Sequence, residues 1–298
     1  MSALIRALSD LKGITPKNIA PMEGPSGVLL CPPSYYDVLE VKNPMMAGHL
    51  GRVDRAGALA QWESVRDALA GSGFSVSVMD PVEGLEDMVF TANPSFAGRG
   101  PRGEKICVLG SMRHPSRRRE TGLHEAWFSK AGYQIKRLKT PGLRFEGGGD
   151  AVWHPGRRLL WGGHGFRTEP EAYEEISEIF DCTVVLLKLS NERFYHLDTC
   201  FCPLTQDSVL IYPPAFERES LELILRLFPM VLVAKEHEAA GLLCCNGVSA
   251  PGKKIILQKG ADGARGALTG AGLFPIEVET GEFLKSGGSA FCMKAFLY

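Results

Sequence analysis

A unit of helix, strand and polar motif recurs five times along this 298-residue chain, and the recurrence constrains the fold more than any other feature. Apolar residues at i, i+3/i+4 spacing predict the helices, and short β-branched runs predict the strands. The interval falls from about sixty residues to about forty-five, a range typical of a closed repeat architecture. The predicted helices span residues 58–70, 116–131, 169–180, 219–228 and 261–271, and the strands after them span 74–79, 133–138, 183–187, 231–233 and 274–278.

A polar motif follows each predicted strand. If the five units close around an axis, equivalent positions converge, and all five motifs then share one central site. The sequence therefore predicts a single pocket that combines two acidic motifs, a histidine–aspartate motif and a cysteine. The five motifs span Gly84–Asn93, Phe145–Asp150, Phe194–Asp198, Cys244–Gly247 and Ser286–Met293.

Nucleophilic thiol chemistry is one interpretation of the last motif. Cys292 follows a turn at Gly287 and Gly288, where glycine lets the backbone approach a ligand closely. An imidazole such as that of His196 can hold a thiolate or move protons, and a carboxylate can orient it. We expect His196 and Asp198 to alternate along a strand and so to face the same side. The alternative is that Cys292 is a small buried apolar residue.

The acidic motifs are open to two interpretations. Glu146 and Asp150 flank three glycines, so they are either solvated acids in a turn or carboxylates that face a planar cation. A carboxylate binds a guanidinium group through parallel charge-assisted hydrogen bonds. In the second interpretation, Glu86, Asp87 and Asn93 of the first motif extend the same clamp.

Composition excludes several classes of function. The net charge of −1 gives no reason to expect a nucleic-acid or membrane partner, and no apolar run approaches the length of a membrane span. Eight cysteines in a chain of this length favour a reducing cytoplasm over a disulfide scaffold. Residues 1–25 are expected to form an N-terminal extension. Its start, Met1–Leu8, is either a short amphipathic helix or a mobile extension and lacks the features of a secretory signal. Residues 26–298 then form one catalytic domain.

Metal, cation and phosphate sites are further possibilities. Cys200 and Cys202 near His196, or Cys244 and Cys245 near His237, are possible metal ligands, but neither pair has the C-x₂-C spacing of a structural zinc site. We therefore expect no metal and no cofactor. The run Arg117–Arg119 is expected to be a solvated helix face, whereas Arg113 just before it is a candidate ligand contact. No phosphate-binding loop is present.

Taken together, the motifs resemble those of the guanidino-group-modifying enzymes. This group includes arginine deiminases, dimethylarginine dimethylaminohydrolases, arginine dihydrolases and amidinotransferases. The resemblance runs from about Cys31 to the C-terminus and rests on Phe90–Asn93, Phe145–Asp150, His196–Asp198 and Gly287–Met293. It implies an α/β fold of five blades around a central active site, called a pentein or five-bladed α/β propeller.

The resemblance also implies roles for individual residues. It makes Cys292 the nucleophile, His196 the general acid and base, and Glu146 a carboxylate that binds the guanidinium of a small-molecule substrate. It requires no cofactor and leaves a homo-oligomer open. Substrate contacts are expected from Asn43, Phe90, Asn93, Arg113, Asp150, Asp198 and Ser289.

Asn93 points to one branch of this group. Deiminases and dimethylarginine hydrolases usually carry an aspartate there, and the asparagine resembles the arginine dihydrolase branch, which converts arginine to ornithine, ammonia and carbon dioxide. A carboxylate at this position repels the oxygen of neutral citrulline, whereas an amide can donate to it and permit a second attack. Two alternatives stay open: an amidinotransferase that uses an amine acceptor, and a non-catalytic arginine-binding protein.

Overall fold

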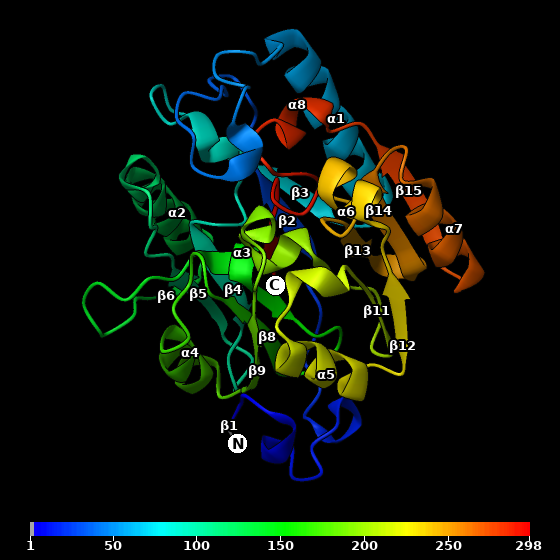
Figure 1. Cartoon of the computed structure of the whole chain (residues 1–298). Coiled ribbons are helices and arrows are strands. Elements are labelled where there is room, and N and C mark those ends of the chain that lie inside the picture. The colour runs from blue at the N-terminus through cyan, green and yellow to red at the C-terminus, as the bar shows by residue number, and fades with distance from the viewer. Residues whose placement is uncertain (1–2) are drawn as a thin grey trace.

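The structure, a computed structural model that describes residues 3–298, contains five small mixed sheets arranged around a common centre (Figure 1). One sheet shows the plan of all five. Strand β4 (Ser95–Arg99) runs antiparallel to β5 (Lys105–Leu109), and helix α2 (Arg118–Lys130) then carries the chain to β6 (Gln134–Lys136), which is parallel to β5.

The next three sheets repeat this order of two antiparallel strands, a helix and a parallel strand. This recurrence confirms the pentein-like repeat that the sequence predicted. The elements are β7 (Ala151–Trp153), β8 (Leu159–His164), α4 (Ala172–Phe180) and β9 (Thr183–Lys188); β10 (Phe201–Pro203), β11 (Ser208–Ile211), α5 (Arg218–Leu227) and β12 (Met230–Val233); and β13 (Val248–Ala250), β14 (Lys254–Gln258), α7 (Asp262–Gly270) and β15 (Phe274–Val278).

The fifth sheet joins the two halves of the chain and closes the ring. Strand β16 (Ala295–Leu297) pairs antiparallel with β2 (Gly27–Leu30), so that Ala295 lies opposite Leu29. Helix α1 (Arg55–Gly71) then leads to β3 (Ser75–Val78), parallel to β2. Strand β16 also contacts β4, and α1 contacts β15, so this sheet touches neighbours on both sides. The C-terminus consequently lies in the middle of the molecule (Figure 1).

The long helices α1, α2, α4, α5 and α7 lie around the outside of the ring (Figure 1). Helix α1 shows why. Its buried residues Ala58, Trp62, Val65 and Leu69 recur every three or four positions and form one apolar stripe facing the sheets. The Asp54 side chain caps its first turn by accepting from the Ala56 N–H. Within residues 3–298, no helix is both long and apolar enough to cross a membrane.

The helix and strand of each predicted unit are present with shifts of a few residues at the ends. The two preceding strands of each sheet were not predicted. Residues 194–198 are not the strand that we expected, because the short 3₁₀ helix η7 (Leu197–Thr199) begins just after His196.

The other short elements are α3 (Gly147–Asp150), α6 (Glu236–Leu242), α8 (Gly281–Leu284), and 3₁₀ turns η1 to η6, η8 and η9 at residues 8–10, 16–18, 44–46, 86–89, 115–117, 192–194, 213–215 and 251–253.

The N-terminal segment packs against the third unit of the ring. Strand β1 (Ala3–Ile5) pairs parallel with β9, so the amphipathic helix considered for this stretch is wrong for these residues, while Met1 and Ser2 lie outside the described part. Further along, Pro21 forms an isolated antiparallel β-bridge with Arg157. Residues 3–25 therefore add a fourth strand to one sheet and contact it again at a second point.

Gly147 lets its segment approach the backbone of Asn93 and Ser95 closely, and we predict that its substitution destabilises the fold. Its φ is +50°, and an added Cβ would lie 2.4 Å from the carbonyl oxygens of both Asn93 and Ser95. Gly142 also has a positive φ, of +78°, but has open space around it. Gly147→Ala should lower the free energy of unfolding by roughly 2–4 kcal/mol, and Gly142→Ala by about 1 kcal/mol, measured by urea unfolding. Equal losses would contradict the proposed close packing.

Candidate active site

The motifs that follow the predicted strands meet at a small cavity in the middle of the ring. Its volume is about 20 Å³, which is room for about one water molecule. Residues from the first, third and fifth motifs line it, together with Lys42, Asn43 and Met46. The second and fourth motifs do not line the cavity as predicted, but Glu146 and Asn246 contact His196 and Cys292 from behind. The lining residues are Lys42, Asn43, Met46, Asp87, Phe90, Asn93, Arg117, Arg167, Tyr195, His196, Ser286, Gly288 and Cys292.

Cys292 is held by groups from two other motifs. The Asn246 side-chain oxygen accepts from the Cys292 and Ser289 N–H groups, and its amide nitrogen lies 3.2 Å from the Cys292 sulfur. The thiol donates to Asp198 Oδ2 at 3.1 Å. Burial and the nearby Asp198 carboxylate raise the pKa of Cys292 well above its usual value. In this state the sulfur is therefore a protonated thiol.

Glu146 is completely buried and joins several segments. One carboxylate oxygen accepts from His196 Nε2 at 2.8 Å and from Arg167 Nη1 at 2.9 Å, and the other accepts from the Arg113 N–H. Burial alone would raise the pKa of Glu146, but the His196 hydrogen bond and the Arg167 charge outweigh it and hold the pKa below its usual range. Because a carboxylate only accepts, His196 carries its proton on Nε2.

Arg117 fixes the orientation of the Asn93 amide. Its Nη1 donates to Asn93 Oδ1 at 2.9 Å, and its other nitrogens contact Glu120 and the Phe90 carbonyl. Since a guanidinium has no acceptor, the Asn93 oxygen must face Arg117. The Asn93 amide nitrogen then faces His196 Nδ1, at 3.5 Å. The amide therefore presents its donor toward His196.

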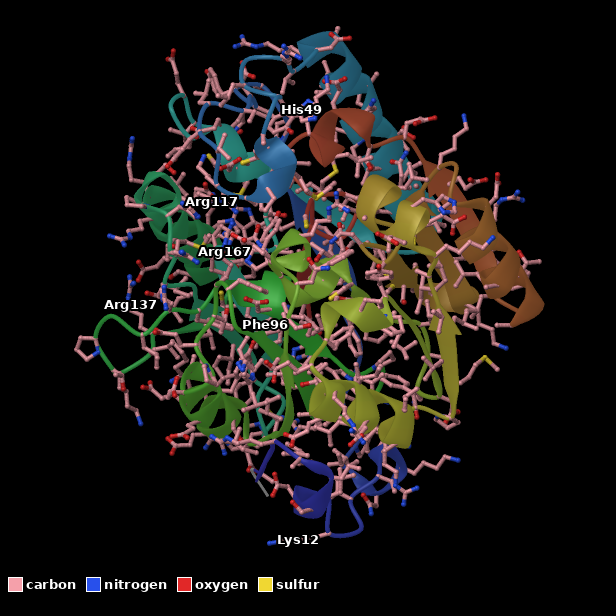
Figure 2. All side chains as sticks on the ribbon, in the orientation of Figure 1. Lys12, His49, Phe96, Arg117, Arg137 and Arg167 are labelled. Carbon is pink, nitrogen blue, oxygen red and sulfur yellow. The ribbon has the colours of Figure 1, made fainter. Side chains whose placement is uncertain are left out.

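The expectation that Arg117 lies on a solvated helix face is wrong. Arg117 is 6% exposed, whereas Arg118 and Arg119 are exposed as expected. Figure 2 shows Arg117 and Arg167 well inside the molecule and Arg137 at its edge. The three consecutive arginines do not reveal the burial of Arg117. This residue precedes the helix and turns inward, toward the carboxylate of Glu120 three residues later.

Two carboxylate oxygens beside the cavity have no partner among residues 3–298. Lys42 Nζ donates to Glu86 and to Asp87 Oδ2, at 2.7 and 2.8 Å, but Asp87 Oδ1 accepts nothing from the described chain. Asp198 Oδ1 is likewise buried and unpaired there. Buried acceptors without donors are costly, so these two oxygens are suited to the N–H groups of a ligand.

Other predicted contact residues lie behind or outside the cavity. Asp150 is fully buried and accepts from the Leu197 and Thr168 N–H groups, which ties α3 to η7, and burial raises its pKa. Ser289 bonds to Thr280. The Arg113 side chain is exposed and donates to the Phe166 carbonyl. Asn43, by contrast, lines the cavity but uses its amide to bond the Ser286 carbonyl and the Met45 N–H.

Lys42, Arg167 and Asn246 are site residues that sequence reasoning did not single out by themselves. Only Asn246 had a signal, because it lies in the motif that follows the fourth predicted strand. Arg167 stacks on the Tyr195 ring and donates to the Lys42 carbonyl. Within residues 3–298, no group of three or more histidine, cysteine or acidic side chains is arranged to hold a metal ion. All eight cysteines are buried free thiols.

Residues 46–298 match a sequence profile of the family described as N,N dimethylarginine dimethylhydrolase, eukaryotic. A bifunctional arginine dihydrolase/ornithine cyclodeaminase of Nostoc, AgrE, is 38% identical over 266 residues, which cover 89% of this chain and 37% of the relative. The chain thus spans little more than a third of the two bifunctional cyanobacterial relatives. The N(G),N(G)-dimethylarginine dimethylaminohydrolase of Mycobacterium tuberculosis is 36% identical, with 88% of this chain and 83% of the relative covered.

Solved structures extend this similarity. The product-bound N-terminal domain of ArgZ, a cyanobacterial arginine dihydrolase, has a TM-score of 0.85 and 36% identity, covering 91% of this chain and 97% of that domain. Another structure of that domain holds a covalently bound reaction intermediate. A dimethylarginine dimethylaminohydrolase at 20% identity has a TM-score of 0.74 and shares the fold.

We predict that Asp198→Asn makes Cys292 more reactive toward iodoacetamide. The substitution removes the charge that, after burial, most strongly raises the thiol pKa, so more thiolate forms at pH 7. Alkylation should be about tenfold faster, the equivalent of about one pKa unit. Peptide mapping and a Cys292→Ser control identify the modified residue. An unchanged or slower rate in folded Asp198→Asn protein would show that Asp198 does not suppress the thiolate.

Proposed function

The chain belongs to the N,N dimethylarginine dimethylhydrolase family. From this membership and from the geometry of the site, we propose that it is a cysteine-dependent hydrolase that acts on the guanidino carbon of arginine or an arginine derivative. We further propose that its main reaction is that of an arginine dihydrolase, which releases ornithine, ammonia and carbon dioxide. Residues 26–298 form the single catalytic domain in this proposal.

One observation carries the proposal: a buried thiol lies beside unpaired carboxylate oxygens. The Cys292 sulfur is 3.1 Å from Asp198, whose other oxygen has no donor among residues 3–298, and Asp87, which lines the cavity together with Cys292, offers a second such oxygen. A planar guanidinium has the N–H groups to satisfy both oxygens. Its bound position then places the central carbon near the sulfur.

The positive charge of the substrate also favours deprotonation of the Cys292 thiol. A guanidinium between Asp87 and Asp198 offsets the negative charge that raises the pKa of Cys292, so the thiolate forms when the substrate is present. The thiol proton passes to the unprotonated Nδ1 of His196, the thiolate attacks the guanidino carbon, and the imidazolium then gives this proton to the ammonia that leaves. His196 then removes a proton from water, which hydrolyses the covalent intermediate to citrulline. Glu146 keeps His196 in position throughout.

Asn93 supports a second round of hydrolysis. The amide nitrogen that Arg117 directs into the cavity can donate to the ureido oxygen of citrulline, which a carboxylate would repel. A second thiolate attack releases another ammonia, and a second water leaves carbon dioxide and ornithine. Arginine and two waters thus give ornithine, carbon dioxide and two ammonia molecules. The relatives named as arginine dihydrolases support this assignment.

Dimethylarginine hydrolysis is the second candidate, and it is favoured by the matching family and by the Mycobacterium tuberculosis relative. It uses the same thiol, imidazole and carboxylates, but stops at citrulline and releases dimethylamine. Neither reaction in this proposal needs a cofactor, a nucleic acid or a membrane, and a homo-oligomer stays open. Eight free thiols suit a cytoplasmic location.

We expect the unmodified protein to convert arginine to ornithine, and Cys292→Ala to lose at least roughly a thousandfold in kcat while staying folded, because the covalent step disappears. Arginine, dimethylarginine, agmatine and citrulline are incubated separately, and the products are identified by mass spectrometry. Glycine is added in parallel to detect transfer to an amine. Full activity of Cys292→Ala would exclude the mechanism, and a new guanidino product with glycine would indicate an amidinotransferase.

We predict that Asn93→Asp changes the product from ornithine to citrulline. The carboxylate can still accept from Arg117, so the fold is kept, but it no longer donates to the citrulline oxygen. The ratio of ornithine to citrulline should fall by roughly tenfold or more, as expected when one charge-sensitive contact is lost. An unchanged ratio would refute the role of Asn93, and citrulline accumulating without ornithine in the unmodified protein would refute the dihydrolase assignment.

A further inference from the structure

A second and larger cavity lies inside the ring and shares no lining residue with the active site. Its volume is about 180 Å³. The first strand of each of the five sheets contributes to its wall, so it follows the central axis of the ring. These wall residues include Phe96 of β4, which is labelled in Figure 2, Val152 of β7, Cys202 of β10, Ser249 of β13 and Phe296 of β16.

The cavity contains a buried lysine whose amine has no carboxylate partner within ion-pair distance among the described residues. Lys294 is 2% exposed and lines the cavity, and within residues 3–298 no acidic oxygen lies within ion-pair distance of its Nζ. Its ammonium instead lies over the rings of Phe291 and Phe296, 3.0 and 3.8 Å from their centroids. Burial lowers the pKa of Lys294 to about 7, although the charges of Asp198, Cys292 and Cys202 oppose this. A buried charge of this kind is costly unless it is paired.

The remaining wall is suited to a flat apolar body. Phe96, Trp153, Phe291, Phe296 and Tyr298 line the cavity, together with small apolar residues. An engineered apolar cavity of about 150 Å³ binds benzene, so the volume here accommodates one ring and a small substituent. The lining includes Gly24, which is exposed, so the cavity extends toward the surface at this position.

We propose that this axial cavity is a binding site for a small aromatic monocarboxylate, with the carboxylate on Lys294 Nζ and the ring against the aromatic wall. A carboxylate supplies the counter-ion that the lysine lacks, in a dry environment where such a pair is strong. An alcohol or an amide of the same shape fills the cavity but leaves the ammonium without an opposite charge. The site is independent of the proposed reaction, because none of its contacts uses Cys292 or His196.

The axial cavity and the active site lie on opposite sides of the same chain segments. Ala92 and Gly148 line it and belong to the segments that carry Asn93 and Glu146. The Ala92 N–H donates to the Cys292 carbonyl, and the Ala92 carbonyl accepts from Gly148. A ligand in the axial cavity therefore touches the reverse side of the chain segments that hold the active-site groups.

Benzoate and benzamide form a matched pair of probes, because they have the same shape and differ in charge. We expect titration calorimetry on the full chain to show saturable benzoate binding that is roughly tenfold or more tighter than benzamide binding, the usual effect of a charge-assisted contact. Lys294→Met, which keeps the length and apolar character of the side chain, should remove this difference. Absence of benzoate binding, or equal binding of both probes to the unmodified protein, would overturn the proposal even if Lys294→Met does not fold.

A competition experiment separates the two cavities. Cys292→Ala is saturated with arginine and then titrated with benzoate, and we expect the benzoate affinity to change by less than about twofold, since the two linings share no residue. Displacement of benzoate by arginine would assign the carboxylate to Arg167 or Arg117 of the active site and would overturn the axial site. Benzoate binding without any turnover of arginine by the unmodified protein would leave the axial site standing and reject the proposed function alone.

Discussion

The buried carboxylate of Glu146 is the interaction on which the arrangement of the active site depends. It holds an imidazole, a guanidinium and a backbone N–H that come from His196, Arg167 and Arg113. Burying an ionised acid costs several kcal/mol unless such partners replace its water. The same contacts that offset this cost therefore fix the relative positions of three separate segments. Removal of one partner leaves the others with an uncompensated charge, so the site can form only when the whole ring has closed.

Ring closure also explains why one molecule has two cavities on one axis. Short strands from five sheets meet at the centre. The segments Phe90–Asn93 and Phe291–Lys294 lie between the two cavities, because each of them contributes residues to both linings. Residues 291–293 form a turn, so successive side chains of this segment point in different directions. Cys292 lines the active site, whereas Phe291 and Lys294 line the axial cavity. One chain segment thus presents a thiol to one cavity and an amine to the other.

The sequence predicted the fold and the convergence of the motifs because both follow from periodicity, which short-range patterns carry. It predicted only some of the polar groups that face the cavity, among them Asn93, His196 and Cys292. Asp150, expected as a clamp, bonds backbone N–H groups, and Arg117, expected in solvent, is buried. These outcomes depend on contacts between residues distant in sequence, such as Arg167 with Glu146. Asn246 was marked only by its place in the repeat, since nothing local shows that it holds Cys292.

The chemistry of a single amide illustrates how such distant contacts define function. An asparagine side chain is an acceptor at one end and a donor at the other, and in isolation its orientation is free. Arg117 removes that freedom because it can only donate, so the Asn93 oxygen faces it and the nitrogen faces His196. An aspartate in the same position would present an acceptor in both directions. The direction in which the Asn93 amide presents its donor is therefore set by Arg117, a residue that also lines the cavity.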